Sequence, residues 1–142
     1  MSGEIEFIDT NLLYYAHDRS ARSKRETAAS LIEKLDAERR GALSIQVLQE
    51  LSVTILSKGP KDVQDELEEI LEDLSDWTVY SPGPADVIEA LRTSRRFKIA
   101  FWDAMIVQAA IGTGARILWS EDLNDGQEYG GVIVRNPFKG VS

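Results

Sequence analysis

Short apolar segments typical of strands alternate with longer segments of helical periodicity along this whole chain. Strands are predicted over residues 5–8, 42–44, 77–80, 116–119 and 132–134. The segments between them carry apolar residues three and four positions apart, which is the spacing of one helix face. Such alternation favours a three-layer α/β/α sandwich around a mainly parallel sheet. With 142 residues, the chain is expected to form a single domain over residues 1–142.

Local signals predict some details of the helices. Ser23-Lys24-Arg25-Glu26 has the pattern of a capping box, so it should begin a helix that Gly41 ends. Residues 104–111 are apolar on nearly every side, which places that helix at the centre of the fold. Trp102 and Trp119 are expected in the core, where they would anchor the ends of their elements.

The composition excludes several kinds of chemistry. The chain has no cysteine and one histidine, His17, which removes disulfides, thiolate catalysis and sulfur-ligated metals. A metal site would therefore use oxygen ligands and bind a hard cation such as Mg²⁺ or Mn²⁺. There is no apolar run of about 18 residues and no signal-peptide pattern at the N-terminus, so a cytoplasmic protein without a membrane span is expected.

The charge is unevenly distributed. The net charge is −8, yet residues 62–76 alone hold eight acids and no base, and the remainder of the chain is neutral. A first basic cluster consists of Arg19, Arg22, Lys24 and Arg25. A second consists of Arg92, Arg95, Arg96 and Lys98. These four side chains would either bind the phosphates of a nucleic acid or form an ordinary solvated helix face.

Four acids stand beside apolar residues at the expected ends of strands and starts of helices: Asp9, Glu50, Asp103 and Asp122. Each could alone be a helix cap, a turn residue or a solvated acid. Parallel topology, however, brings the residues that follow strands to one edge of the sheet, where ligands bind in such folds. Carboxylates grouped among apolar residues are costly unless a cation binds them. The sequence therefore predicts a divalent-cation site suited to phosphodiester hydrolysis.

Several segments resemble a known family. They are Phe7-Ile8-Asp9-Thr10-Asn11, the internal Glu50, Phe101-Trp102-Asp103-Ala104, Trp119-Ser120-Glu121-Asp122 and the late Asn136-Pro137-Phe138. Their order over the whole chain resembles the PIN domain, and within that family the VapC toxins of prokaryotic toxin–antitoxin pairs. The resemblance implies an endoribonuclease that depends on Mg²⁺ or Mn²⁺, acts on RNA, often forms a homodimer and is inhibited by a small cognate antitoxin.

The resemblance also implies roles for individual residues. Asp9, Glu50, Asp103 and Asp122 match the acidic positions, and Thr10, Asn11 and Ser120 match their polar companions. Glu121 and Asp125 compete with Asp122 for the fourth acidic position. Asp122 is favoured because it stands two residues after Ser120; Glu121 would then be a solvated neighbour and Asp125 an accessory ligand. A bound cation would activate water and shield the phosphate, giving 5′-phosphate and 3′-hydroxyl products.

Other functions stay open at this point. A PIN nuclease could act in RNA processing without being a toxin, and a PIN domain without activity could serve as an RNA-binding or scaffold module. A phosphatase that uses Asp9 as nucleophile is disfavoured, because such enzymes have a second Asp where this chain has Asn11. The RNA target, the number of metal ions and the antitoxin are not specified by the sequence.

Overall fold

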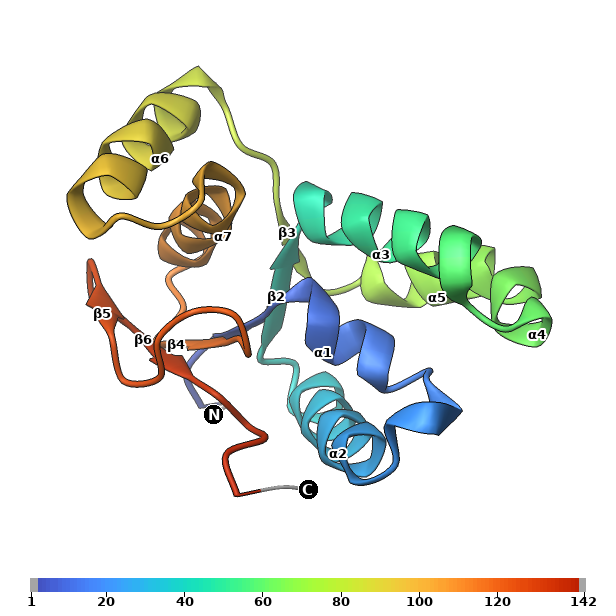
Figure 1. Cartoon of the computed structure of the whole chain (residues 1–142). Helices are drawn as coiled ribbons and strands as arrows, with labels where there is room; N and C mark the ends of the chain where they lie inside the picture. The colour runs from blue at the N-terminus through green and yellow to red at the C-terminus, as the bar shows by residue number, and fades with distance from the viewer. Residues whose placement is uncertain (1–2, 141–142) are drawn as a thin grey trace.

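The computed structural model describes residues 3–140, and in this part of the chain a six-stranded sheet lies between layers of helices (Figure 1). The strands are β1 (Glu6–Ile8), β2 (Gly41–Ser44), β3 (Thr78–Tyr80), β4 (Ile117–Trp119), β5 (Glu128–Tyr129) and β6 (Val132–Arg135). Their order is β3-β2-β1-β4-β6-β5, and every neighbouring pair is parallel except β5 with β6. The predicted, mainly parallel sheet is thereby confirmed.

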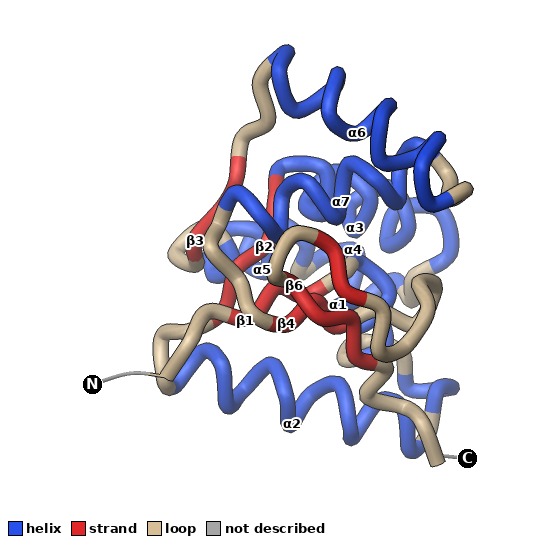
Figure 2. Tube along the Cα trace, turned by 90° about the vertical axis from the view of Figure 1, so that its left-hand side faces the viewer, coloured by secondary structure: helices blue, strands red, loops and turns tan. Residues whose placement is uncertain are grey.

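Helices cover both faces of this sheet. They are α1 (Thr10–Tyr15), the 3₁₀ turn η1 (Arg19–Ala21), α2 (Ser23–Ala37), α3 (Ile45–Lys58), α4 (Lys61–Asp65), α5 (Leu67–Leu74), α6 (Pro84–Phe97) and α7 (Phe101–Gly112). Figure 2 shows α2 on one side of the strands and α6 and α7 on the other, which confirms the three-layer sandwich. None of the helices described has the length and apolar character that a membrane crossing requires.

The core lies along the central strands and α7. Phe7 and Ile8 of β1, Leu43 of β2 and Leu118 of β4 are fully buried, as expected for strands covered on both faces. Helix α7 buries six of its residues, among them Val107, and so occupies the central position that its apolar sequence predicts. This rigid centre fixes the carboxyl ends of β1, β2 and β4 relative to one another.

Some local expectations are wrong. The N-cap of α2 is Arg22, with a φ of 55°, so Ser23 is the first helical residue and not the cap of a capping box. Gly41 does not end this helix, which stops at Ala37, but begins β2. A glycine is required there because a Cβ atom would lie 2.4 Å from the ring of Trp77.

Three further differences concern helices and tryptophans. The apolar spacing within residues 62–76 predicts a single helix, but the segment forms two, α4 and α5. The short elements α1 and β5 had no sequence signal strong enough to predict them. Trp102 is not in the core: it is 63% exposed, because it lies on the outer side of the first turn of α7. Trp119 is half-buried, and its indole Nε1 donates to Glu6 Oε1 at 2.7 Å.

Candidate active site

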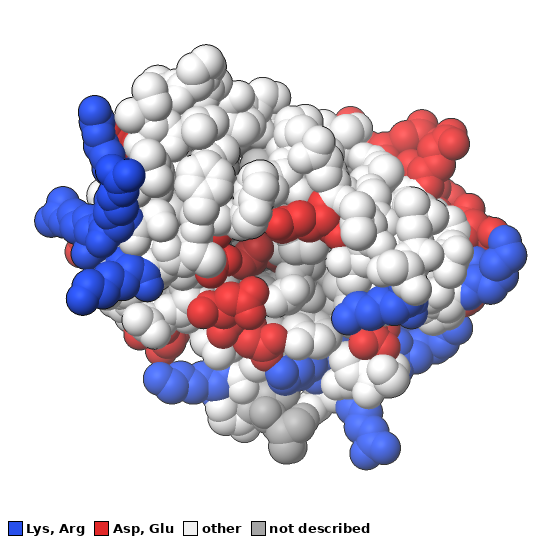
Figure 3. All heavy atoms as spheres, turned by 45° about the horizontal axis from the view of Figure 1, so that its top comes forward, with Lys and Arg blue, Asp and Glu red and all other residues white. Residues whose placement is uncertain are grey.

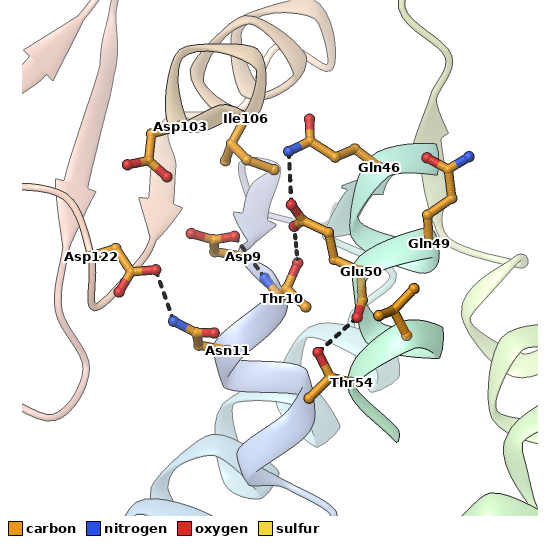
Figure 4. A pocket seen from close by; sticks show the side chains of 11 residues that line it. Asp9, Thr10, Asn11, Gln46, Gln49, Glu50, Thr54, Asp103, Ile106 and Asp122 are labelled. Atoms are coloured by element: carbon orange, nitrogen blue, oxygen red, sulfur yellow. Dashed lines mark hydrogen bonds between the residues drawn. The ribbon is translucent and has the colours of Figure 1, made fainter. Parts of the chain in front are cut away.

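All four predicted acids line one cavity of about 430 Å³ at the carboxyl edge of the sheet. Its lining consists of Asp9, Thr10, Asn11, Gln46, Gln49, Glu50, Val53, Thr54, Asp103, Ile106 and Asp122. Figure 3 shows acidic side chains gathered around a hollow in the middle of this face. In Figure 4 the four carboxylates point into the same space from β1, α3, α7 and the loop after β4. The topological prediction that these residues converge is therefore correct.

Asp9 forms the floor of the cavity. It directly follows β1 and is the N-cap of α1, so its Oδ1 accepts from Thr10 N at 2.7 Å while its Oδ2 accepts from Ser120 Oγ at 2.9 Å. Only 6% of Asp9 is exposed. This burial, together with the nearby charges of Asp122 and Glu50, raises the pKa of Asp9 to about 7, and the two hydrogen bonds oppose the rise only in part.

Glu50 enters from α3 and is held at both oxygens. Its Oε1 accepts from Thr10 Oγ1 at 2.7 Å, and its Oε2 accepts from Gln46 Nε2 at 3.1 Å. Gln46 lies one helical turn before Glu50, and its Nε2 also donates to the backbone oxygen of Trp102 at 3.2 Å. These bonds connect α1, α3 and α7 around the cavity, so the position of Glu50 depends on all three elements (Figure 4).

Asp103 and Asp122 complete the ring of acids. Asp103 stands in the first turn of α7, where the helix dipole favours a negative charge. Burial nevertheless raises its pKa, as do the charges of Asp122 and Glu50. Asp122 lies in the loop after β4, and its Oδ2 accepts from Asn11 Nδ2 at 2.8 Å. Asn11 thus positions an acid across the cavity mouth.

The two rivals of Asp122 point elsewhere. Glu121 accepts from Tyr15 Oη at 2.6 Å and is paired with Lys24. Asp125 accepts from the backbone N of Asn136 at 2.8 Å and pairs with Lys139 Nζ at 3.1 Å. Neither residue lines the cavity. The fourth acid of the cavity is therefore Asp122, and Asp125 acts as a local cap outside it.

Ser120 connects two of the acids. It is fully buried, donates to Asp9 and accepts from the backbone N atoms of Asp122 and Leu123 at 3.2 and 3.4 Å. One hydroxyl group therefore fixes both the carboxylate at the end of β1 and the loop that carries Asp122.

We expect Ser120→Ala to lower the free energy of unfolding by about 1–3 kcal/mol, because it leaves buried polar groups without their partner. Ser52→Ala is the matched control: Ser52 Oγ donates only to Leu48 O within α3, and alanine is a better helix former. Chemical denaturation measures both. Equal stability of the two variants would contradict the central role given to Ser120.

Several lining residues were not predicted from the sequence. Gln46 and Thr54 stand four residues on either side of Glu50 on α3, so helical spacing could have indicated that they share its face. Val53 and Ile106 stand three residues after Glu50 and Asp103, which is also the spacing of one helix face. Gln49 carried no such signal, because its exposure to the cavity depends on how α3 packs.

The basic cluster on α6 lies outside the cavity. Arg92, Arg95, Arg96 and Lys98 are all exposed, Arg92 is paired with Glu89, and Arg96 lies over the Phe97 ring. None of the four lines the cavity. In Figure 3 many of the Lys and Arg side chains lie toward the margins of this face. Contact between this cluster and RNA stays a prediction.

The donor set suits a hard divalent cation. The cavity offers four carboxylates and no nitrogen or sulfur ligand, which matches the preference of Mg²⁺ and Mn²⁺. Burial, and to a lesser extent the charges of the neighbouring acids, raises the pKa values of Asp9 and Asp103, and a bound cation would favour their ionised forms. As the side chains stand, no three acids or histidines among residues 3–140 form a ready coordination group.

Comparison with known proteins identifies the family. The profile of the PIN domain matches residues 7–124, so this chain belongs to the PIN domain family. No curated protein matched the chain.

Similar solved structures share the fold. A toxin–antitoxin complex from Klebsiella pneumoniae has a TM-score of 0.67 and 20% identity, covering 93% of this chain and 97% of that one. VapBC2 from Rickettsia felis, bound to a promoter DNA fragment, has a TM-score of 0.65 and 23% identity, covering 93% and 98%. VapC20 of Mycobacterium tuberculosis, a sarcin-ricin loop cleaving toxin, has a TM-score of 0.64 and 16% identity, covering 82% and 91%.

Proposed function

We propose that this chain is a divalent-metal-dependent endoribonuclease and the toxin of a toxin–antitoxin pair. The observation that carries the nuclease proposal is the convergence of Asp9, Glu50, Asp103 and Asp122 on one cavity at the carboxyl edge of the sheet. The toxin proposal is supported by the fold shared with toxins of toxin–antitoxin complexes, one of which cleaves the sarcin-ricin loop.

In this proposal Asp9, Glu50 and Asp103 would be the principal ligands of Mg²⁺ or Mn²⁺. When bound, the cation lowers the pKa of water and neutralises charge on the scissile phosphate. Thr10 and Ser120 keep the carboxylates of Glu50 and Asp9 in fixed orientations through their hydroxyl groups. These hydrogen bonds matter because a small displacement of a metal-binding carboxylate weakens metal binding.

Asp122 is assigned the role of positioning the attacking water. Asn11 occupies its Oδ2, so Oδ1 is left to accept a hydrogen bond from water at the exposed mouth of the cavity. The water oxygen would form a bond to phosphorus as its proton passes to a carboxylate, and the bond from phosphorus to the 3′-oxygen would break as that oxygen takes up a proton from solvent. The ribose 2′-hydroxyl takes no part, so the products carry 5′-phosphate and 3′-hydroxyl ends.

The nature of the RNA ends tests this proposal. Incubation of total RNA with the purified chain and Mg²⁺ should generate 5′-phosphate ends that ligation-based sequencing captures, and EDTA should prevent their formation. Products with 2′,3′-cyclic phosphate ends would contradict hydrolysis by water. Absence of any cleavage would instead favour a PIN domain that binds RNA or acts as a scaffold.

Growth of a bacterial host tests the toxin role. Expression of the chain should arrest growth, and Asp9→Ala should abolish the arrest because it removes the buried carboxylate of the cavity. Asp76→Ala is the control, since it removes one exposed carboxylate elsewhere on the surface. An active nuclease that leaves growth unchanged would favour RNA processing over toxicity.

Two protein partners are part of the proposal. The toxin role requires a small antitoxin, and the solved neighbours include complexes with such partners. A homodimer also stays a prediction; it would cover exposed apolar side chains such as Val87, Ile88 and Leu91 on α6. Light scattering of the purified chain would detect the dimer. Action on cellular RNA places the protein in the cytoplasm.

A further inference from the structure

The acidic cavity continues into two further hollows along the chain's α1 and α3 helices. The next hollow, of about 200 Å³, shares Asn11 and Thr54 with it. A third, of about 530 Å³, shares Tyr14, Asp18 and Lys58 with the second. Together the second and third hollows form a groove between α1 and the C-terminal half of α3, and we refer to it as the α1–α3 groove. In Figure 4, Asn11 and Thr54 lie on facing helices where this groove leaves the cavity.

The groove has a regular row of residues on α3. Glu50, Thr54 and Lys58 are spaced four residues apart, so they lie along one side of the helix. A rise of 1.5 Å per residue puts Lys58 about 12 Å from Glu50 along the helix axis. That span corresponds to about three to four nucleotides at the stacked spacing of about 3.4 Å. A strand cut at the acidic cavity is therefore long enough to reach Lys58 within a few nucleotides.

Lys58 is the cation that is available to a ligand in this groove. No carboxylate of residues 3–140 forms an ion pair with it, and its Nζ lies over the Tyr14 ring, 5.1 Å from the centroid. Arg19, at the far end, is already paired with Asp62 at 3.0 Å. The acid in the groove, Asp18, accepts from both Ser20 N and Ser20 Oγ.

The α3 side of the groove also presents hydroxyl groups. Thr54 Oγ1 donates to Glu50 O at 2.8 Å, and Ser57 Oγ donates to Thr54 O at 3.2 Å. Because each proton is used within the helix, the oxygen atoms are left as acceptors. A ribose 2′-hydroxyl is a donor that single-stranded RNA provides at every nucleotide. The cation at Lys58, the hydroxyl oxygens of Thr54 and Ser57 and the length of the groove thus all suit a single RNA strand.

We propose that the RNA substrate leaves the acidic cavity along the α1–α3 groove and that Lys58 binds one of its phosphates. This inference rests on the proposed nuclease function and adds the path of the substrate and a positioning residue. It gives the principal phosphate contact to Lys58 and not to the exposed α6 cluster, which lies outside both hollows.

Salt-dependent binding of RNA tests the path. We would measure the anisotropy of a labelled, random-sequence single-stranded RNA in an Asp103→Asn background, which limits cleavage. Lys58→Met should weaken binding about tenfold at low salt and reduce the slope of log K against log salt by about 0.7, the value for one phosphate contact on a single strand. Methionine keeps an unbranched stem over the Tyr14 ring, and Lys58→Arg should restore both affinity and slope.

Lys34→Met is the matched control. Lys34 is exposed near the end of α2, and its replacement changes the net charge equally without touching the groove. Affinity and slope should stay at their original values in this variant. Equal effects of Lys58→Met and Lys34→Met, with RNA still bound and cleaved by the unaltered chain, would overturn the path but leave the nuclease proposal standing. Failure of the unaltered chain to bind or cleave RNA would overturn both.

Discussion

Asp103→Ala is expected to slow RNA cleavage about 10³-fold while the chain remains folded. Asp103 is partly exposed at the start of α7 and makes no hydrogen bond that the rest of the described chain would miss. Its removal takes away one of the carboxylates that would hold the cation, and loss of transition-state stabilisation of about 4 kcal/mol corresponds to this factor. Single-turnover cleavage of a labelled RNA measures the rate, and circular dichroism verifies the fold.

Two control variants separate the cavity acids from their neighbours. Asp125→Ala removes a carboxylate that caps Asn136, and Glu121→Gln neutralises one that is bonded to Tyr15 and Lys24. Both should keep cleavage within about threefold of the unaltered chain, a change of under about 1 kcal/mol. If Asp125→Ala were as damaging as Asp103→Ala, the assignment of the fourth acid to Asp122 would be wrong.

The stability of the metal-free protein should fall as the pH rises from about 4 to 7. Burial raises the pKa of Asp9 to about 7 from its ordinary value of 3.8. Below the ordinary value the carboxyl is protonated in both states, whereas between the two values only the unfolded chain is ionised. The folded state then binds more protons, so the free energy of unfolding decreases with pH, by up to about 4 kcal/mol, and levels off above about pH 7.

Asp9→Asn isolates this effect. Asparagine still caps α1 and can accept from Thr10 N, but it does not titrate. In EDTA the variant should therefore be more stable than the unaltered chain at pH 8 and of similar stability at pH 4, as measured by urea denaturation. An increasing stability difference toward low pH would have the wrong sign and would contradict the buried, protonated state of Asp9.

Addition of Mg²⁺ should raise the free energy of unfolding, which the ionisation of Asp9 lowers. A ligand that binds only the folded chain stabilises it by about 2.7 kcal/mol at 100 times its Kd. We expect this gain at pH 8 for the unaltered chain and a much smaller one for Asp9→Asn, because a neutral amide is a weaker ligand for a hard cation. The same gain in both proteins would place the ion elsewhere.

The fold and the four acids could be predicted from the sequence for a topological reason. Parallel strands place whatever follows them at one edge, so Asp9 after β1 and Asp122 after β4 had to lie near each other. Helical spacing then fixed the side of α3 that carries Glu50. Those inferences depend on chain connectivity, which a sequence pattern records directly.

Other features depend on packing angles that no pattern records. Trp102 belongs to the first turn of a mostly buried helix, yet the orientation of α7 on the sheet leaves this ring in solvent. Arg92, Arg95, Arg96 and Lys98 are neighbours in sequence and so attracted the prediction of an RNA contact. Lys58 is isolated in sequence. Helical spacing puts it on the side of α3 that carries Glu50, but only the packing of α1 against α3 forms the groove that it lines.

Binding of Mn²⁺ to the purified chain tests the central claim most directly, because electron paramagnetic resonance counts free and bound ions without any RNA. The unaltered chain should bind Mn²⁺ in competition with Mg²⁺, Asp9→Asn and Asp103→Asn should each weaken this binding at least about tenfold, and Asp125→Asn should not change it. Equal Mn²⁺ affinity in the unaltered chain and in both cavity variants would show that the four carboxylates do not form the metal site.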